Sequence, residues 1–330
     1  MGILRKLLYF FLLLIFLIFS AIFAISVGPV QISFQDVVNA LFGIADELTE
    51  TIVWKIRLAR VLLAIGAGIA LSTGGAVVQS IFQNPLAEPY ILGISAGSVL
   101  GVILSLLFLG EYPYSSQAFS FLFALLTIFI VYRVAGIGGS IQPSTLLLAG
   151  IAITALFSAI TSYLIYAHFS KNIASILFWT MGGFWHASLI SAVSVIIVAL
   201  ASSASILVFW KQLNAMALGD SFALSIGVDV GTTRAILLLL VSLSVSFAVS
   251  FTGIIGFVGL VVPHIARMVG GADHRTLILF SGLTGAILLL WADTVSRTIV
   301  YGEEIPVGII TAMLGVPFFL YLLARRRRLC

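Results

Sequence analysis

The chain has 330 residues, of which 61% are apolar, and only 16 Lys or Arg and 12 Asp or Glu carry a charge. A soluble domain is about a quarter charged, so a chain with 8% charged residues cannot cover a water-facing surface, and a soluble enzyme is excluded. Intrinsic disorder is excluded too, because it requires low hydrophobicity and high charge. Most of the surface must face lipid, and the net charge of +4 is a topology signal rather than evidence for nucleic-acid binding.

Long apolar runs predict transmembrane helices, each of which needs about 20 residues to cross the bilayer. The first run, 7–27, follows Arg5 and Lys6 and exceeds the roughly 7–15 apolar residues of a signal peptide, so we expect it to be retained. The other runs are 58–79, 90–109, 117–134, 144–166, 189–209, 232–251, 254–269, 277–295 and 306–323. The predicted fold is all-α: one polytopic membrane domain over 1–330, with about ten transmembrane helices in a compact bundle.

The segment 254–269 is the weakest of these predictions, because it contains Pro263, His264 and Arg267. Backbone that is broken at membrane depth is tolerated only where protein or a water-filled cavity surrounds it. We therefore expect this segment to face the protein interior.

Ten spans place both termini on one side, and the basic residues indicate which side. With the N-terminus inside, eleven of the sixteen Lys and Arg fall on the inner side, including the closing run Arg325 to Arg328. Seven acidic residues fall on the outer side: Asp36, Asp46, Glu47, Glu50, Glu111, Glu303 and Glu304. Both termini are therefore predicted to be cytoplasmic.

Small residues recur at every fourth position in two of the predicted helices. Gly93, Gly97 and Gly101 form one stripe, and Gly66, Ala70 and Gly74 form another. Such spacing lets helix backbones approach closely, which favours a compact bundle.

Motifs for bond chemistry are missing. No Gly-x-x-x-x-Gly-Lys-Ser/Thr loop is present, so any ATP hydrolysis must occur on another chain. The four histidines are scattered and the single cysteine, Cys330, is the last residue, so no metal site is predicted. Ser95 lies in a Gly-x-Ser-x-Gly pattern and His264 could pair with it in an intramembrane protease, but this stretch opens an apolar helix and helix packing explains it better.

Asp293 is the only acid well inside a predicted span, four residues before Arg297. One interpretation is a proton or sodium relay in an ion-coupled secondary transporter. The other, which we favour, is a structural i, i+4 ion pair with Arg297.

The loop at about 210–231 is the longest inner one. Leu213, Ala217 and the intervening Met216 recur at helical spacing, and Gly219 is typical of a helix C-cap. Asp220 or Ser221 is expected to cap a second short helix that ends at Gly227. The loop is nearly free of the basic residues of a lipid-bound helix, so two short helices that dock a cytoplasmic partner are predicted.

On the outer side, Arg57 and Arg60 begin the second span and Arg297 ends the ninth. These side chains either extend along the helix to the membrane interface or form a ring that receives carboxylates of an external protein. The charges alone support both readings equally.

Several motifs now make the chain resemble the FecCD-type permeases, the membrane subunits of ABC importers for vitamin B12, ferric siderophores and haem. They are Arg57-Leu-Ala-Arg60, Gly74-Gly75, Gln79, Asn84-Pro-Leu-Ala-Glu-Pro89, Leu92-Gly-Ile-Ser-Ala-Gly97, Leu146-Leu-Leu-Ala-Gly150, Trp179-x-Met-Gly-Gly183, Ala217-Leu-Gly-Asp220, Gly256-Phe-Val-Gly-Leu-Val-Val-Pro-His-Ile-Ala-Arg267, Asp273-His-Arg275, Ala292-Asp293 and Pro306-Val-Gly-Ile-Ile-Thr311. They cover nearly the whole chain in order.

The resemblance implies a type II importer permease in a prokaryotic plasma membrane, acting by alternating access. It implies a homodimer, two cytoplasmic ATPase subunits that bind ATP and Mg, and an extracytoplasmic substrate-binding protein. The outer arginines, Arg57, Arg60 and Arg297, match family positions that grip the binding protein, which favours docking. The ATPase-coupling positions it implies are Leu213, Ala217, Leu218, Gly219, Asp220, Ser221 and Gly227.

The cytoplasmic gate of the family corresponds to Pro143, Ser144 and Thr145, where Pro143 replaces a hydroxyl residue of the B12 importers. Gln79, Gln83 and Asn84 either face the pathway or bridge helices. An iron–siderophore chelate is the favoured substrate, with vitamin B12, haem and molybdate as other possibilities.

Overall fold

The computed structural model describes residues 3–110, 112–137, 139, 141–169, 173–300 and 302–326. Glu111, Arg327, Arg328 and Cys330, which are named above, lie outside these residues. In chain order the elements are α1 (Ile3–Ser26), α2 (Phe34–Leu41), α3 (Glu47–Glu50), the π-helical η1 (Thr51–Leu58), α4 (Ala59–Ile81), the 3-10 helix η2 (Pro89–Leu92), α5 (Ile94–Leu109), α6 (Ser115–Ala135), α7 (Pro143–His168), α8 (Ile173–Thr180), α9 (Leu189–Val208), α10 (Trp210–Ala217), α11 (Asp220–Ser225), α12 (Val230–Thr252), α13 (Val258–Gly270), α14 (His274–Ser296) and α15 (Val307–Arg326).

The predicted helical membrane fold is confirmed. Within the described residues, seven helices are long and apolar enough to cross a membrane, and α5, α13 and α15 are shorter apolar helices. These ten correspond in order to the ten predicted spans. Large apolar side chains along α1, among them Phe11, Ile15 and Phe19, are at least half exposed, as lipid-facing side chains of a multi-pass membrane protein must be.

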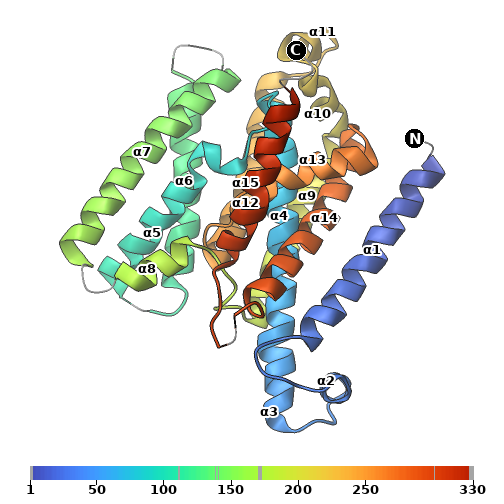
Figure 1. The fold of residues 1–330 in the computed structure, drawn as a ribbon. Helices are drawn as coiled ribbons and strands as arrows, with labels where there is room; N and C mark the ends of the chain where they lie inside the picture. Colours follow the sequence, from blue (N-terminus) through green and yellow to red (C-terminus); the bar gives the residue numbers. More distant parts are fainter. Residues whose placement is uncertain are drawn as a thin grey trace.

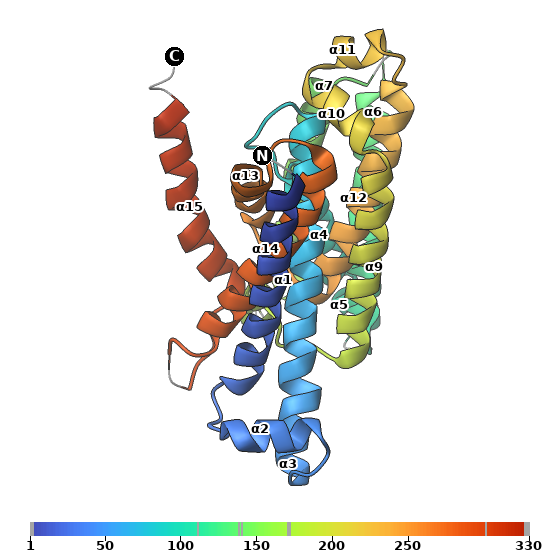
Figure 2. The ribbon, with the colours of Figure 1, turned by 90° about the vertical axis from the view of Figure 1, so that its right-hand side faces the viewer.

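Helix α4 runs through the middle of the bundle, where α9, α12, α13 and α14 pack around it (Figures 1 and 2). The helices α5, α6 and α7 form a group on one side, and α1 lies on the other side against α14. Helices α10 and α11 mark one end of the bundle, called here the α11 end, where α1 also begins. Helices α2 and α3 mark the opposite end, the α2 end (Figure 2).

The second span is longer than its apolar run predicted. It is continuous from Glu47 to Ile81, 35 residues, or about 50 Å at 1.5 Å per residue. The hydrocarbon layer is only about 30 Å thick, so the polar beginning of this helix extends beyond it and carries α2 and α3 outward. The wide turns of η1 lie in this extension and include Arg57.

Glycines let α4 touch its neighbours backbone to backbone. A Cβ on Gly68 would lie 2.3 Å from the carbonyl oxygen of Gly285 on α14, and one on Gly75 would lie 2.0 Å from that of Gly259 on α13. The predicted stripe on α5 also allows close backbone contact, because a Cβ on Gly101 would lie 2.3 Å from the Phe119 carbonyl oxygen of α6. Small residues therefore set the helix spacing, as their pattern indicated.

Protein groups replace the backbone hydrogen bond that is missing inside α13, the span that was the weakest prediction. Pro263 lies inside α13 and cannot donate to the carbonyl of Gly259, four residues earlier. Gln79 of α4 supplies the missing donor, because its Nε2 donates to the carbonyls of Gly259 (3.3 Å) and Leu260 (3.1 Å). Its Oε1 accepts from Arg267 Nη1 at 2.6 Å, so Gln79 bridges α4 and α13.

The variant Gly75→Ala tests this close packing. Its new methyl group would meet the Gly259 carbonyl, and such overpacking costs on the order of 1–3 kcal/mol. We expect a lower Tm in detergent for Gly75→Ala. The control is Gly256→Ala, since a Cβ there meets nothing within 4 Å; equal Tm values for the two variants would contradict the packing argument.

Candidate functional site

Five charged side chains form an arginine cluster toward the α2 end: Arg57, Arg60, Asp293, Arg297 and Glu304. Arg60 lies at its centre. Its Nε and Nη2 are both 2.9 Å from Asp293 Oδ1, and its Nη1 donates to the two Glu304 carboxylate oxygens at 2.9 and 2.8 Å. Asp293 is fully buried, whereas the Glu304 side chain is 29% exposed.

The predicted pair of Asp293 and Arg297 is present, with Oδ2 and Nε 3.4 Å apart. The shorter ion pair of Asp293, however, is with Arg60, 233 residues away in the chain. Hydropathy and helical spacing gave no signal for that pair. Glu304 was likewise counted only as an outer acid.

Arg57 and Arg297 hold the end of α1. Arg57 Nη1 donates to the carbonyls of Ile25 (2.8 Å) and Ser26 (3.0 Å), and Arg297 Nη2 donates to that of Ala24 (2.5 Å). These carbonyls lie in the last turn of α1, where helices lack internal donors. All three arginines of the cluster are at most 6% exposed, because carboxylates and backbone carbonyls of the protein surround them.

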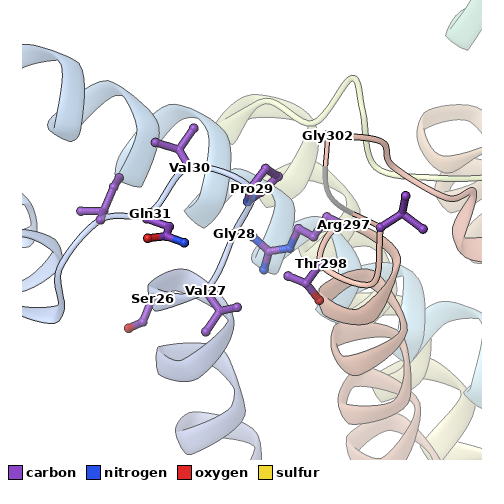
Figure 3. A pocket seen from close by; sticks show the side chains of 11 residues that line it. Ser26, Val27, Gly28, Pro29, Val30, Gln31, Arg297, Thr298 and Gly302 are labelled. Carbon is purple, nitrogen blue, oxygen red and sulfur yellow. The ribbon is translucent and has the colours of Figure 1, made fainter.

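A hollow of about 490 Å³ lies beside the cluster. It is lined by the 26–32 segment after α1 and by Arg297, Thr298, Val300 and Gly302 after α14. Figure 3 shows the Arg297 side chain between these two segments. Three guanidinium groups (Arg57, Arg60, Arg297) face two carboxylates (Asp293, Glu304), so the cluster has one positive charge in excess, and the hollow gives access to it.

At the α11 end, the residues predicted to couple to an ATPase form α10, α11 and the turn between them. Leu213 is fully buried and anchors α10. Gly219 has φ +123°, a conformation that favours glycine, and Gly227 follows α11 with φ +84°. Ala217, Leu218 and Ser221 are exposed.

The prediction that Asp220 or Ser221 caps the N-terminus of α11 is wrong. Gly219 precedes the helix and no side chain caps it; Asp220 is instead its first residue, and its carboxylate pairs with Arg234 of α12 at 2.6 Å. Sequence reasoning missed Arg234. The next helix does have a side-chain cap, because Asp229 accepts from the Thr232 backbone at 3.1 Å, and hydrogen bonds from Thr232 lower the pKa of Asp229.

The predicted gate residues lie across a cleft from α11. The cleft has a volume of about 850 Å³; Pro143 and Ser144 line one side, and Asp220 and Ser221 the other. Thr145 lies in the first turn of α7, where its Oγ1 accepts from the Gln142 backbone at 3.2 Å.

The other predicted pathway residues, Gln79 and Asn84, line a second hollow of about 330 Å³. Gln79 is buried in the bridge described above, and Asn84 Oδ1 accepts from the Leu86 backbone at 3.0 Å. Ser95, the candidate nucleophile, is the second residue of α5, and the described part of the chain has no strand that would make an elbow there.

A second buried connection, which the sequence analysis missed, joins α10 to the bundle. Asn214 Nδ2 donates to Asp273 at 2.9 Å, and its Oδ1 accepts from the His274 backbone at 2.9 Å. The His274 ring lies between Asn214 and Ser80 of α4, 2.7 Å and 2.5 Å away. Motion of α10 is therefore tied to α4 and α14.

The arginine cluster yields a stability prediction. Asp293→Asn would leave Arg60 and Arg297 buried with less compensation, and removing one partner of a buried pair costs about 3–5 kcal/mol. We expect a large loss of Tm in detergent for Asp293→Asn and a smaller one for Glu304→Gln, because Glu304 is more exposed. Exposed Glu303 provides the control Glu303→Gln. Equal Tm values for all three variants would contradict the stabilising role of the cluster.

The chain is similar in sequence to known transport proteins. The model of the FecCD transport family matches residues 13–325. The cobalamin import system permease protein BtuC of Halobacterium salinarum is 40% identical, covering 86% of this chain and 76% of the relative. The hemin transport system permease protein HmuU of Yersinia pestis is 39% identical (96% and 95%), and the Fe(3+)-citrate import system permease protein YfmD of Bacillus subtilis is 37% identical (98% and 96%).

Solved structures support the same family as the sequence similarities. A transporter assigned to the metal-chelate type of ABC transporter, in an inward-facing conformation, superposes with a TM-score of 0.86 at 30% identity, covering 96% of this chain and 99% of that one. PsaBC of Streptococcus pneumoniae, at 20% identity and a TM-score of 0.55, shares the fold. The chain therefore belongs to the FecCD transport family: it is an ABC transporter permease subunit and not itself an ATPase.

Proposed function

We propose that this permease imports a metal chelate, with an iron chelate as the favoured substrate. The observation that carries the import assignment is the division of the bundle: a buried basic cluster toward the α2 end, and two short helices beside the gate cleft at the α11 end. Support for the substrate class comes from the relatives, whose names specify cobalamin, hemin and ferric citrate. Each of these is a metal held by a larger organic ligand.

The α11 end is assigned to the cytoplasm. Eleven of sixteen basic residues fall on this side when the N-terminus is inside, which is the arrangement that the positive-inside rule favours. Acidic residues gather toward the other end, where Asp36 lies on α2 and Glu47 and Glu50 on α3. Both termini are thereby cytoplasmic, in a prokaryotic plasma membrane.

Two ATPase subunits are proposed to dock at the α11 end, where they bind ATP and Mg. Apolar side chains are exposed on and beside α11: Leu218 (72%), Phe222 (45%), Leu224 (61%) and Ile226 (57%). An exposed apolar group on a short helix outside the spans is typical of a protein-binding surface. A coupling role for 210–231 follows from this surface.

An extracytoplasmic binding protein is proposed to dock over the arginine cluster. Its carboxylates would meet the excess positive charge through the hollow beside Arg297. Glu304 is the more exposed carboxylate on Arg60, and exchange with a partner's carboxylate would keep that guanidinium paired. Substrate release then occurs into a path that ends at Pro143, Ser144 and Thr145.

A second copy of the chain completes the proposed transporter. Helix α15 diverges from the bundle toward its C-terminal end (Figure 2), and its Met313 and Leu314 are 69% and 59% exposed. A homodimer would cover part of this face and place the path between the two copies. The ion-coupled alternative is not proposed, because two arginines already hold Asp293.

Reconstitution with the partner ATPase tests this function. We expect Leu218→Glu with Leu224→Glu to abolish ATPase binding and ATP-driven uptake, because two carboxylates would enter an apolar contact. The measurements are co-purification, ATP hydrolysis and uptake of a radiolabelled ferric chelate into liposomes. Leu48→Glu, equally exposed at 68% but on α3, is the control. Unchanged ATPase binding by the double variant would refute docking at α11.

A further inference from the structure

Arg234 on α12 connects two segments that the gate cleft separates. Its Nη2 donates to Asp220 Oδ1 and Oδ2 at 2.8 and 2.6 Å, and its Nη1 donates to the Ile141 carbonyl at 2.6 Å. The Arg234 side chain is 3% exposed and that of Asp220 is 31% exposed, so the guanidinium is buried while its carboxylate partner faces the cleft.

The two partners of Arg234 lie at mechanically distinct positions. Asp220 is the first residue of α11 and is 31% exposed, on the segment proposed to receive the ATPase. Ile141 stands two residues before Pro143, at which α7 begins. Between α11 and the start of α7 lies the cleft of about 850 Å³, and Arg234 is among its lining residues. Arg234 therefore links α11 directly to the segment that precedes α7.

The chemistry of the contact requires arginine. The planar guanidinium presents several donors in fixed directions, whereas lysine offers a compact charge that makes no bidentate pair. Arg234 Nε is buried without a partner in the described part of the chain, so both Nη groups carry the connection. Arg133, also near the proposed cytoplasmic end, is exposed and makes no such bridge within the described ranges.

We propose that Arg234 is the positioning residue that transmits movement of α10 and α11 to the gate segment at Pro143 to Thr145. This inference rests on the proposed function, because it takes α11 as the ATPase contact and the start of α7 as the gate. With the pair intact, ATP-driven movement of α11 shifts Ile141 and hence the first turn of α7. Without it, the ATPase still binds its exposed apolar surface on α11, but the gate no longer follows.

The experiment follows the gate itself in the liposome-reconstituted complex. Cys330 is the only native cysteine, so Cys330→Ser with Ser144→Cys gives a single thiol on the exposed side of the cleft. We measure its rate of modification by a water-soluble maleimide, without nucleotide and after trapping with ATP and vanadate. Coupling energies between sites correspond to about 5–150-fold effects, so we expect trapping to change this rate about fivefold or more in the otherwise native chain.

Arg234→Lys and Asp220→Asn are then added separately. In Arg234→Lys we expect nucleotide trapping to persist and the resting modification rate to stay native, while the change on trapping falls below about twofold. Asp220 lies in the predicted coupling loop, so for Asp220→Asn the change in rate is compared per trapped nucleotide and is also expected to fall below about twofold. Arg133→Lys, the same substitution at an exposed site, should respond like the native chain. Two variants are used so that misfolding of one leaves the other to decide.

The outcomes separate the two proposals. A native-sized response to trapping in Arg234→Lys and Asp220→Asn overturns the role of Arg234 and leaves the proposed function standing. An altered resting rate with a native response also overturns it, because that result shows a purely structural role. No response in the native chain refutes the gate assignment, and the inference falls with it.

Discussion

Close backbone contact between α4 and its neighbours is the constraint on which this bundle depends. No methyl group fits between Gly68 and Gly285, or between Gly75 and Gly259, so α4 has a narrowly defined position against α14 and α13. In lipid, where apolar side chains gain little by leaving their solvent, such packing replaces the hydrophobic effect as the force between helices. The same helix carries Arg60 near one end and Gln79 and Ser80 near the other.

Polar groups then stabilise the places where helical hydrogen bonding stops. Arg57 and Arg297 supply donors to the last turn of α1, and Gln79 supplies a donor to the carbonyl that Pro263 leaves without one. Each of these side chains donates to a backbone carbonyl that its own helix leaves without a donor. If a binding protein docks over the arginine cluster as proposed, these buried arginines contribute by holding the end of α1 in place.

The spans were predictable because apolar length reports directly on bilayer thickness. The helix contacts of the glycine stripes were predictable as a kind of contact, although not by partner. Arg60 with Asp293 and Arg234 with Asp220 were not predictable, because each pair joins different helices and only the tertiary fold brings them together. Asp220 illustrates the limit: its local sequence suggested a helix cap, but the nearby guanidinium of Arg234 outcompetes the backbone of its own helix, as a charge-assisted bidentate pair should.

The two ends of the molecule differ in how the charges of their buried arginines are compensated. This difference fits the two roles proposed for them, docking at the α2 end and transmission of movement at the α11 end. Toward the α2 end, Arg60 binds a fully buried Asp293 and a partly exposed Glu304, so the second carboxylate is the more accessible of the two. At the α11 end, Arg234 binds the carboxylate of Asp220 and the backbone carbonyl of Ile141, so one guanidinium joins two segments of the chain. The first arrangement is suited to docking and release, and the second to transmitting displacement. The proposed function uses both arrangements, because a binding protein would dock transiently at one end while an ATPase would pass through its ATP cycle at the other.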